Sequence, residues 1–432
     1  MGPTHSLKKV VTVSALLLLL TLSLGGGGVA SKSNDSTATY ENLRLFTEVL
    51  SIIQNQYVDE VTSKDIIYGA IKGTLRGLDP HSAFLDPESY KDMQVETSGS
   101  FGGLGIEITL RDDVLTVVAP IEGTPAYRAG IHPGDRIVKI EGLPTKDMQL
   151  TDAVKRMRGK PGTKVTIGIM REGWVEPKDF PITREQIRVQ SVRTMELEPG
   201  LEYIRLRQFQ EQTANDLETL LDKYTKEKKM QGLILDLRNN PGGLLTASVE
   251  VAEKFLESGK LIVYTEGRVR NQNMRFSSTA RRVYTEFPMV VLVNQGSASA
   301  SEIVAGALQD HGRAVVLGTT TFGKGSVQTI IPLSDGSGLR LTTAKYFTPK
   351  GRTIHGKGLA PDIVVEAPRP TSAAGPTPEG APSPTPPLTG TETPKELLKR
   401  DVQLQRAVDL LKAMKILDKS RPPATGQQAQ KR

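Results

Sequence analysis

The chain has 432 residues, 38% of them hydrophobic and 24% charged, which is enough apolar sequence for two or three globular domains. The formal net charge is +7, but lysine and arginine do not cluster with aromatic residues, so nucleic-acid binding is not expected. Cysteine is absent, which excludes disulfides, a thiolate nucleophile, a lipid-bearing cysteine and cysteine metal sites.

Residues 1–30 have the pattern of a secretory signal peptide. Lys8 and Lys9 precede an uncharged stretch with five consecutive leucines, and small residues follow it. We therefore expect an extracytoplasmic location, most simply the bacterial periplasm. The alternative is a retained anchor, in which case the protein would contact the membrane only through this segment.

Residues 31–96 are expected to form an N-terminal helical region. Apolar residues recur at helical spacing between Tyr40 and Val58, and a second helical pattern covers 65–75. An apolar stripe of this kind packs on its own core or pairs two chains. Together with a helix near the C-terminus, it favours a homodimer or larger homo-oligomer.

Residues 97–174 contain three motifs in a characteristic order. A glycine-rich stretch, FGGLGIEI, precedes a turn, AGIHPGD (129–135), and a helical pattern begins at Leu150. This order resembles a PDZ domain, which binds an extended C-terminal peptide by strand addition. The resemblance implies carboxylate binding by the backbone N–H groups of Leu104, Gly105 and Ile106, and selection of an apolar terminal residue by Leu150, Val154 and Met157. The alternative is a PDZ fold used only for packing.

Residues 175–367 alternate strand and helix patterns, which predicts an α/β domain with a substantially parallel sheet. A proline-rich linker (368–394), an amphipathic helix (395–420) and a disordered tail (421–432) follow. The apolar positions of that helix are Leu397, Val402, Leu404, Val408, Leu411 and Ile416. A helix behind a linker needs a surface, so it packs on its own chain or on a second one.

Ser299 lies where the apolar strand VVLV gives way to small residues and then to a helix. A helix N-terminus stabilises developing negative charge, so a nucleophilic serine is well placed there. The simpler interpretation is an N-cap serine. The stretch DLRNNPGG (236–243) favours the nucleophile, because its glycines offer further exposed N–H groups for an oxyanion.

Lys324 lies in GTTTFGKGS, which differs from a phosphate-binding loop because Gly325 replaces the final hydroxyl residue. The residues that follow alternate as in a strand, whereas a phosphate loop precedes a helix. We therefore expect Lys324 to act as a base at the same sheet edge as Ser299. Such a base must be neutral, and burial beside Phe322 and Gly323 would lower its pKa.

These motifs, in this order from about Tyr40 to Ile416, resemble the carboxyl-terminal processing (tail-specific) serine peptidases. The resemblance implies a ClpP/crotonase-like α/β peptidase core with an inserted PDZ domain and flanking helices, and it implies no cofactor or metal. It also implies protein or peptide substrates with apolar C-termini and an activating adaptor protein as a possible partner. The implied site residues are Ser299 as nucleophile, Lys324 as general base, Gln328 as the group that orients the lysine, and an oxyanion hole from the N–H group of Ala300 and one in the Gly242–Gly243 turn.

Three alternative interpretations concern the base, a metal site and the functional class. A histidine base is disfavoured, because His311 would lie past the end of the helix that Ser299 begins, roughly 15 Å away. A metal hydrolase is disfavoured, because the histidines lack ligand spacing. A non-catalytic PDZ scaffold or chaperone that binds protein C-termini is the alternative from a different functional class.

Overall fold

The computed structural model describes residues 33–227, 230–367 and 393–420. The predicted signal peptide, nearly all of the proline-rich linker and the tail at 421–432 lie outside the described residues. The chain divides into two compact units, residues 1–80 and 81–432, and each is described by itself.

The first unit contains two helices, α2 (Ser33–Gln56) and α3 (Ser63–Arg76). Thr62 caps α3, since its hydroxyl accepts a hydrogen bond from the N–H of Asp65 at 3.1 Å. The apolar stripe predicted along α2 is present and largely exposed, with Leu43 and Phe46 among its exposed residues.

The PDZ-like part of the second unit is a six-stranded antiparallel sheet with two short helices. Its elements are β3 (Ile106–Arg111), β4 (Val114–Pro120), α5 (Pro125–Arg128), β5 (Arg136–Ile140), β6 (Leu143–Pro144), α6 (Leu150–Met157), β7 (Lys164–Met170) and β8 (Lys178–Thr183). Isoleucine and valine side chains fill its core, including Ile137 and Ile167. Strand β3 is at the edge of this sheet, and β4 is its only neighbour within the part of the chain that the structure describes.

A short antiparallel ribbon connects the PDZ-like sheet to the rest of the unit, between β2 (Ser100–Gly103) and β9 (Glu185–Arg188). Helix α4 (Pro87–Ser98) precedes β2 and ends at Gly99, which has a φ of 67°. Glycine suits this position because the left-handed region is unfavourable for other residues.

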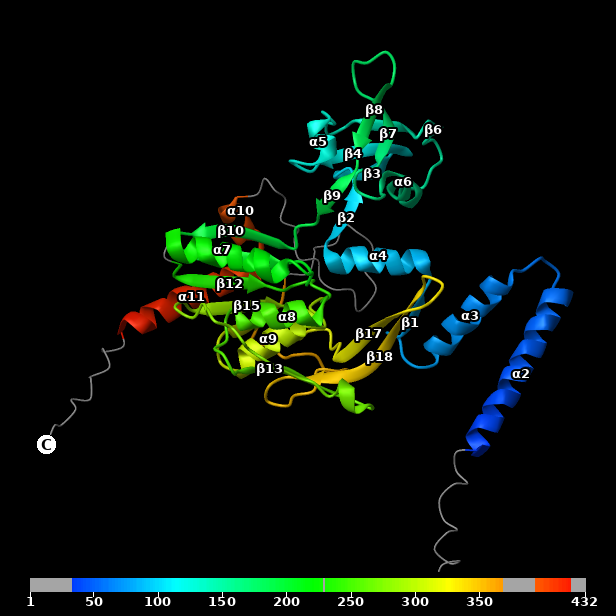
Figure 1. Ribbon diagram of the computed structural model, residues 1–432. Helices are drawn as coiled ribbons and strands as arrows, with labels where there is room; N and C mark the ends of the chain where they lie inside the picture. The colour runs from blue at the N-terminus through cyan, green and yellow to red at the C-terminus, as the bar shows by residue number, and fades with distance from the viewer. Residues whose placement is uncertain (1–32, 228–229, 368–392, 421–432) are drawn as a thin grey trace, which may run out of the picture. The chain divides into compact units, whose positions relative to one another are not determined.

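The core of the second unit is a six-stranded sheet in the order β10-β11-β12-β15-β16-β19 (Figure 1). Its strands are β10 (Val192–Glu198), β11 (Leu201–Leu206), β12 (Gly232–Asp236), β15 (Met289–Val293), β16 (Val315–Gly318) and β19 (Ile363–Val364). Only the β10–β11 pair is antiparallel, so the predicted α/β core with a substantially parallel sheet is confirmed.

The two faces of this sheet are covered by different helices, as the alternation of side chains along each strand requires. On β15, Val291 points to one face, which α7 (Thr213–Glu227), α8 (Leu245–Glu253) and α9 (Ala300–Asp310) cover. Val290 points to the other face, where the C-terminal helices pack.

A second sheet runs beside the first in the order β1-β18-β13-β14, with β17 paired to β18. It consists of β1 (Ala83–Leu85), β13 (Leu261–Gly267), β14 (Arg275–Ser277), β17 (Ser326–Pro332) and β18 (Gly338–Phe347), and a 3₁₀ turn, η1 (Arg270–Gln272), joins β13 to β14. A strand rather than a helix therefore follows Lys324, as the alternating pattern predicted.

The C-terminal segment forms two helices, α10 (Pro394–Arg400) and α11 (Val402–Ser420), so the prediction of one continuous helix was wrong. The chain is extended at Asp401, whose carboxylate accepts the N–H of Leu404 and starts the second helix. Both helices pack on their own chain. Four predicted apolar positions are buried, Leu397, Leu404, Val408 and Leu411, whereas Val402 and Ile416 are exposed.

Candidate active site

Three loops leave the carboxyl ends of three adjacent parallel strands. We call them the glycine loop (237–243, after β12), the serine loop (294–299, after β15) and the lysine loop (319–325, after β16). The carboxyl edge of a parallel sheet is where α/β proteins place their sites. The fold thus brings together the three stretches that the sequence singled out.

Ser299 joins the serine loop to α9 in an unusual backbone conformation, with φ 56° and ψ −114°. A non-glycine residue pays for such a conformation in strain, and strained serines at strand-to-helix turns present their hydroxyl outward. The N–H of Glu302 donates to the backbone carbonyl of Ser299 at 2.9 Å, and the Ser299 hydroxyl lies beside that of Tyr346. An ordinary N-cap residue has extended backbone angles, so Ser299 differs from one in its conformation.

Lys324 is half-buried, and no ion pair involves its ammonium among the described residues. Burial lowers its pKa, and the positive charge of Arg340 lowers it further, against an opposing effect of the Glu302 carboxylate. The expectation that Phe322 would help to bury the lysine was wrong. The Phe322 side chain is 62% exposed, so it is not part of the buried surroundings of the lysine.

The Glu302 carboxylate, fully buried in the first turn of α9, ties the serine and lysine loops together. One of its oxygens accepts the N–H groups of Ser299 at 2.8 Å and Lys324 at 2.9 Å. Its other oxygen accepts the N–H of Gly323 at 2.7 Å and the hydroxyl of Thr321 at 2.5 Å. Nucleophile and base candidates thus share one anchor.

Sequence reasoning missed Glu302, although one signal was available. An acid three residues after Ser299 fits a capping box, in which it binds back to the N-terminus of its own helix. The hydrogen bonds that Glu302 accepts from the lysine loop leave no pattern in the sequence around Glu302. Burial raises the pKa of Glu302 against the effect of these hydrogen bonds, so the site holds a desolvated carboxyl group next to Lys324.

Tyr346, on β18, was also missed. Its buried hydroxyl donates a hydrogen bond to the backbone carbonyl of Lys324. Burial raises the pKa of Tyr346 well above its usual value; the Glu302 carboxylate adds to the shift and the Ser299 hydroxyl opposes it. Tyr346 therefore stays protonated and holds the lysine loop against the second sheet.

Gln328, on β17, is oriented by hydrogen bonds from its amide nitrogen to the hydroxyls of Thr342 at 2.8 Å and Ser326 at 3.2 Å. These bonds leave its amide oxygen buried, with no hydrogen-bond partner among the described residues. A buried acceptor without a donor is costly. Since Gln328 follows Lys324 by four residues, the lysine is the candidate donor.

The glycine loop lies directly against the serine. A methyl group placed on Gly242 would come within 2.8 Å of the Ser299 β-carbon and 3.1 Å of the Ala300 nitrogen. The N–H of Gly242 is already bonded to the side-chain oxygen of Asn240 at 2.9 Å. Among the described residues, the N–H groups of Gly243 and Ala300 have no hydrogen-bond acceptor. Gly243 is therefore the better candidate of the two glycines for an oxyanion donor.

The ring nitrogen Nε2 of His311 lies 2.7 Å from the Leu261 carbonyl, at the far end of α9 from Ser299. The structure thus separates it from the serine, as helix length predicted. Among the described residues, no three side chains of histidine, aspartate or glutamate converge as metal ligands.

The peptide-binding residues predicted from the PDZ resemblance lie at the start of edge strand β3 and on helix α6. Leu104 is buried, and Gly105 has a φ of 75°, so the chain turns tightly before β3. On α6, Leu150 and Val154 are half-buried while Met157 belongs to the core. Ile106 begins β3.

Comparison with known families gives three matches along the chain. Residues 200–365 match the model described as peptidase family S41, residues 116–171 match that of the PDZ domain, and residues 24–89 match that of the activating protease CtpB N-terminal domain. Among the described residues, none of the helices combines the length and apolar character that crossing a membrane requires.

Two relatives cover most of the chain. The carboxy-terminal-processing protease of Bartonella bacilliformis is 46% identical over 346 residues, 79% of each chain. The carboxyl-terminal-processing protease of Synechocystis is 42% identical over 326 residues, 73% of this chain and 75% of the relative. Among solved structures, the photosystem II D1 C-terminal processing protease aligns with a TM-score of 0.43 and 32% identity, over 75% of this chain and 92% of that one.

Proposed function

The chain belongs to peptidase family S41, together with carboxy-terminal-processing proteases, and from this premise we propose that it is an exported endopeptidase with a Ser299–Lys324 dyad. In this proposal the PDZ domain recognises apolar C-terminal tails. The observation that carries the dyad is the Glu302 carboxylate oxygen that accepts the N–H groups of both residues. This shared hydrogen-bond acceptor fixes the position of the serine loop relative to the lysine loop.

In the first half-reaction, neutral Lys324 removes the hydroxyl proton of Ser299 as the serine oxygen attacks the scissile carbonyl carbon. The oxygen of the tetrahedral intermediate receives hydrogen bonds from the N–H groups of Gly243 and Ala300. The lysine ammonium then gives its proton to the leaving amine, the peptide C–N bond breaks, and an ester to Ser299 remains.

In the second half-reaction, neutral Lys324 removes a proton from water, which attacks the ester carbonyl. Collapse of this second intermediate returns the proton to Ser299 and releases the new carboxylate. The lowered pKa of Lys324 serves both steps, because only the neutral amine can accept a proton. The amide oxygen of Gln328 would accept a hydrogen bond from the amine and direct its lone pair.

Recognition of the tail would occur on edge strand β3, which has one free side for an added peptide strand. The backbone N–H groups at Leu104, Gly105 and Ile106 would bind the terminal carboxylate. Leu150 and Val154 offer half-buried apolar surface, above the buried Met157, for the last side chain. An apolar C-terminal residue fits this surface better than a charged one.

The test is cleavage of an unfolded reporter protein that ends in apolar residues, followed by mass spectrometry of the products. Wild type should cleave it, while Ser299→Ala, Lys324→Ala and Lys324→Arg should not, because arginine remains charged. Lys345→Ala, a change at an exposed lysine on β18, is the matched control and should cleave normally. Tail binding without cleavage by wild type would instead support a PDZ scaffold or chaperone.

A further inference from the structure

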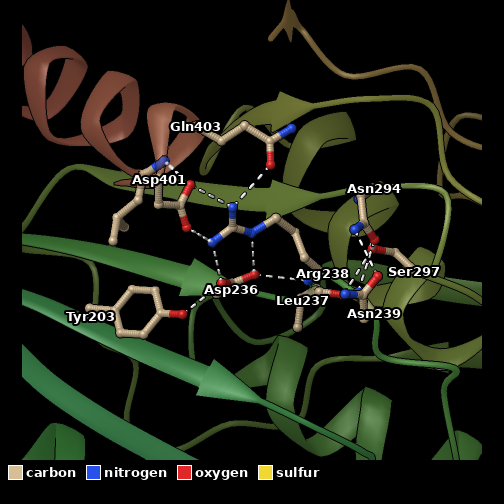
Figure 2. Close-up of polar contacts among 10 residues, drawn as sticks. Tyr203, Asp236, Leu237, Arg238, Asn239, Asn294, Ser297, Asp401 and Gln403 are labelled. Carbon is tan, nitrogen blue, oxygen red and sulfur yellow. Dashed lines mark hydrogen bonds and ion pairs between the residues drawn. The ribbon is translucent and has the colours of Figure 1, made fainter. Parts of the chain in front are cut away.

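A buried charged cluster links the C-terminal helices to the glycine loop (Figure 2). Arg238, which is 2% exposed, stands at the start of that loop. Its guanidinium donates to both carboxylate oxygens of Asp236, at 3.0 and 2.7 Å, and to both of Asp401, at 2.9 and 2.7 Å. The last N–H donates to Gln403 at 3.0 Å, so all five guanidinium donors are used.

The remaining groups of the cluster are also satisfied. The Tyr203 hydroxyl donates to Asp236 at 2.7 Å, and the amide nitrogen of Gln403 donates to the Val365 carbonyl at 2.7 Å. Burial disfavours the charged form of Asp236, yet Arg238 outweighs it and holds the pKa of that carboxyl below its usual range. A complete network of this kind permits one geometry only.

The same loop is bonded on its other side to the serine loop. The N–H of Asn239 donates to the Asn294 side chain at 2.9 Å, and the Asn294 amide donates back to Asn239 at 2.8 Å. The Asn240 carbonyl accepts the N–H of Ala298 at 3.0 Å and the Ser301 hydroxyl at 2.9 Å. Arg238 is therefore one residue away from the hydrogen bonds that align the glycine loop with Ser299.

Asp401 is 163 residues away from Arg238 along the chain and comes from the break between α10 and α11. Leu397 of α10 packs in the same apolar cluster as Leu404 and Leu411 of α11, and this packing does not itself require a buried carboxylate at the break. An acid buried here costs desolvation, which only its partners offset. Docking of the helices alone therefore does not explain why charged groups are buried here at the cost of their desolvation.

We propose that Asp401 and Gln403 are positioning residues for the oxyanion-binding glycine loop, so that docking of the C-terminal helices is part of assembling the active site. This inference rests on the proposed function, in which Gly243 binds the oxyanion. The helices act through Arg238 and do not touch the substrate. The C-terminal segment thereby becomes a component of the peptidase site rather than an appendage behind a linker.

The test compares Asp401→Asn with Asp409→Asn in the full chain. Both remove one carboxylate from α10–α11, but Asp409 makes only an exposed pair with Arg406. Asp401→Asn should lower kcat about 10- to 100-fold, as expected for a small displacement of an oxyanion donor. KM, tail-peptide affinity and the pH midpoint of activity should not change, because Asp401 contacts neither the candidate peptide site nor Lys324. Asp409→Asn should behave as wild type.

Leu411→Ala separates positioning from simple destabilisation, because it weakens the packing of α11 without touching Arg238. Under folding conditions it should keep the wild-type kcat. Hydrogen exchange gives a readout that does not need turnover, and residues 237–243 should exchange faster in Asp401→Asn than in Asp409→Asn.

Two results would overturn the inference: equal kcat and equal exchange for the two aspartate variants, or a loss of kcat in Leu411→Ala that matches Asp401→Asn at the same loss of stability. A wild-type protein that binds tails without cleaving them would overturn the proposed function instead, and the exchange comparison would still decide whether Asp401 orders the loop.

Discussion

The candidate active site at the carboxyl edge of the core sheet and the candidate peptide site of the PDZ-like sheet differ in how many of their hydrogen-bonding groups are already paired. At the carboxyl edge of the core sheet, buried side chains such as Glu302 and Asn240 accept N–H groups of the loops, while among the described residues the N–H groups of Gly243 and Ala300 have no acceptor. In the candidate peptide site, one side of edge strand β3 has backbone N–H and carbonyl groups that no neighbouring strand of the sheet pairs, and half-buried apolar residues lie on α6. Chemistry needs a few groups fixed in advance, whereas recognition needs a surface that a peptide can complete.

The largest expected effect comes from crowding the candidate active site. Gly242→Ala adds a methyl group within 2.8 Å of the Ser299 β-carbon, at a φ of 106° that alanine rarely adopts. We expect kcat to fall by about 10³-fold, the loss associated with an oxyanion donor, with tail binding unchanged. Gly259→Ala is the control, since it has a similarly positive φ of 84° and open space around it. Kinetics and tail-peptide binding would be measured together, and weaker tail binding by Gly242→Ala would break the contrast between the two regions.

The next effect comes from removing the shared anchor without changing its shape. Glu302→Gln keeps the volume but replaces one acceptor oxygen by an N–H₂ group that faces other donors. We expect kcat to fall by about 10²-fold, because loop displacements of 1 Å cost this much. Glu250→Gln, at an exposed position of α8, should have no effect. Single-turnover measurements would report the acylation step, and a normal rate in Glu302→Gln would refute the anchoring role.

A smaller effect is expected in the candidate peptide site. Val154→Asp places a charge where the apolar terminal residue of a tail would pack, so KM should rise about tenfold with kcat retained. Thr151→Asp introduces the same charge on an exposed face of α6 and should leave KM unchanged. A short substrate without a tail should be cleaved equally by both variants. Equal KM values for a tailed substrate would show that tails bind elsewhere.

The smallest effect sharpens the electrostatics of the base. Arg340→Met removes a positive charge that lowers the pKa of Lys324, so this pKa should rise and activity should begin at a higher pH. Below the wild-type midpoint, activity should fall several-fold, while at high pH it should match wild type. Arg340→Lys keeps the charge and should keep the profile. A shift of the profile to lower pH would contradict a lysine base.

Local patterns predicted the elements that carry the site but not the contacts between them. The change from an apolar strand to small residues placed Ser299 at a helix start, and the alternation after Lys324 predicted β17 rather than a phosphate-binding helix. Both signals lie within a few residues of their feature. Tyr346, Arg340 and Asp401 reach the site from β18 and from the break before α11, and sequence alternation reports that a residue is buried without naming its neighbour.

The exposed side chain of Phe322 illustrates the same limit at short range. An aromatic residue two positions before the lysine was expected to shield it, yet the Phe322 side chain is exposed. Here the buried acid and the second sheet enclose the lysine loop instead. The fold class could be predicted because it depends on periodicity, and the shielding of the lysine could not because it depends on one turn.

The backbone of Ser299 carries a consequence for how such a protein evolves. Its φ of 56° and ψ of −114° suit glycine, and a serine there costs about 1–3 kcal/mol of folding free energy. Selection for stability alone would therefore favour glycine at this position. Under the proposed function, turnover requires the serine hydroxyl, so this one residue lowers folding stability in exchange for activity.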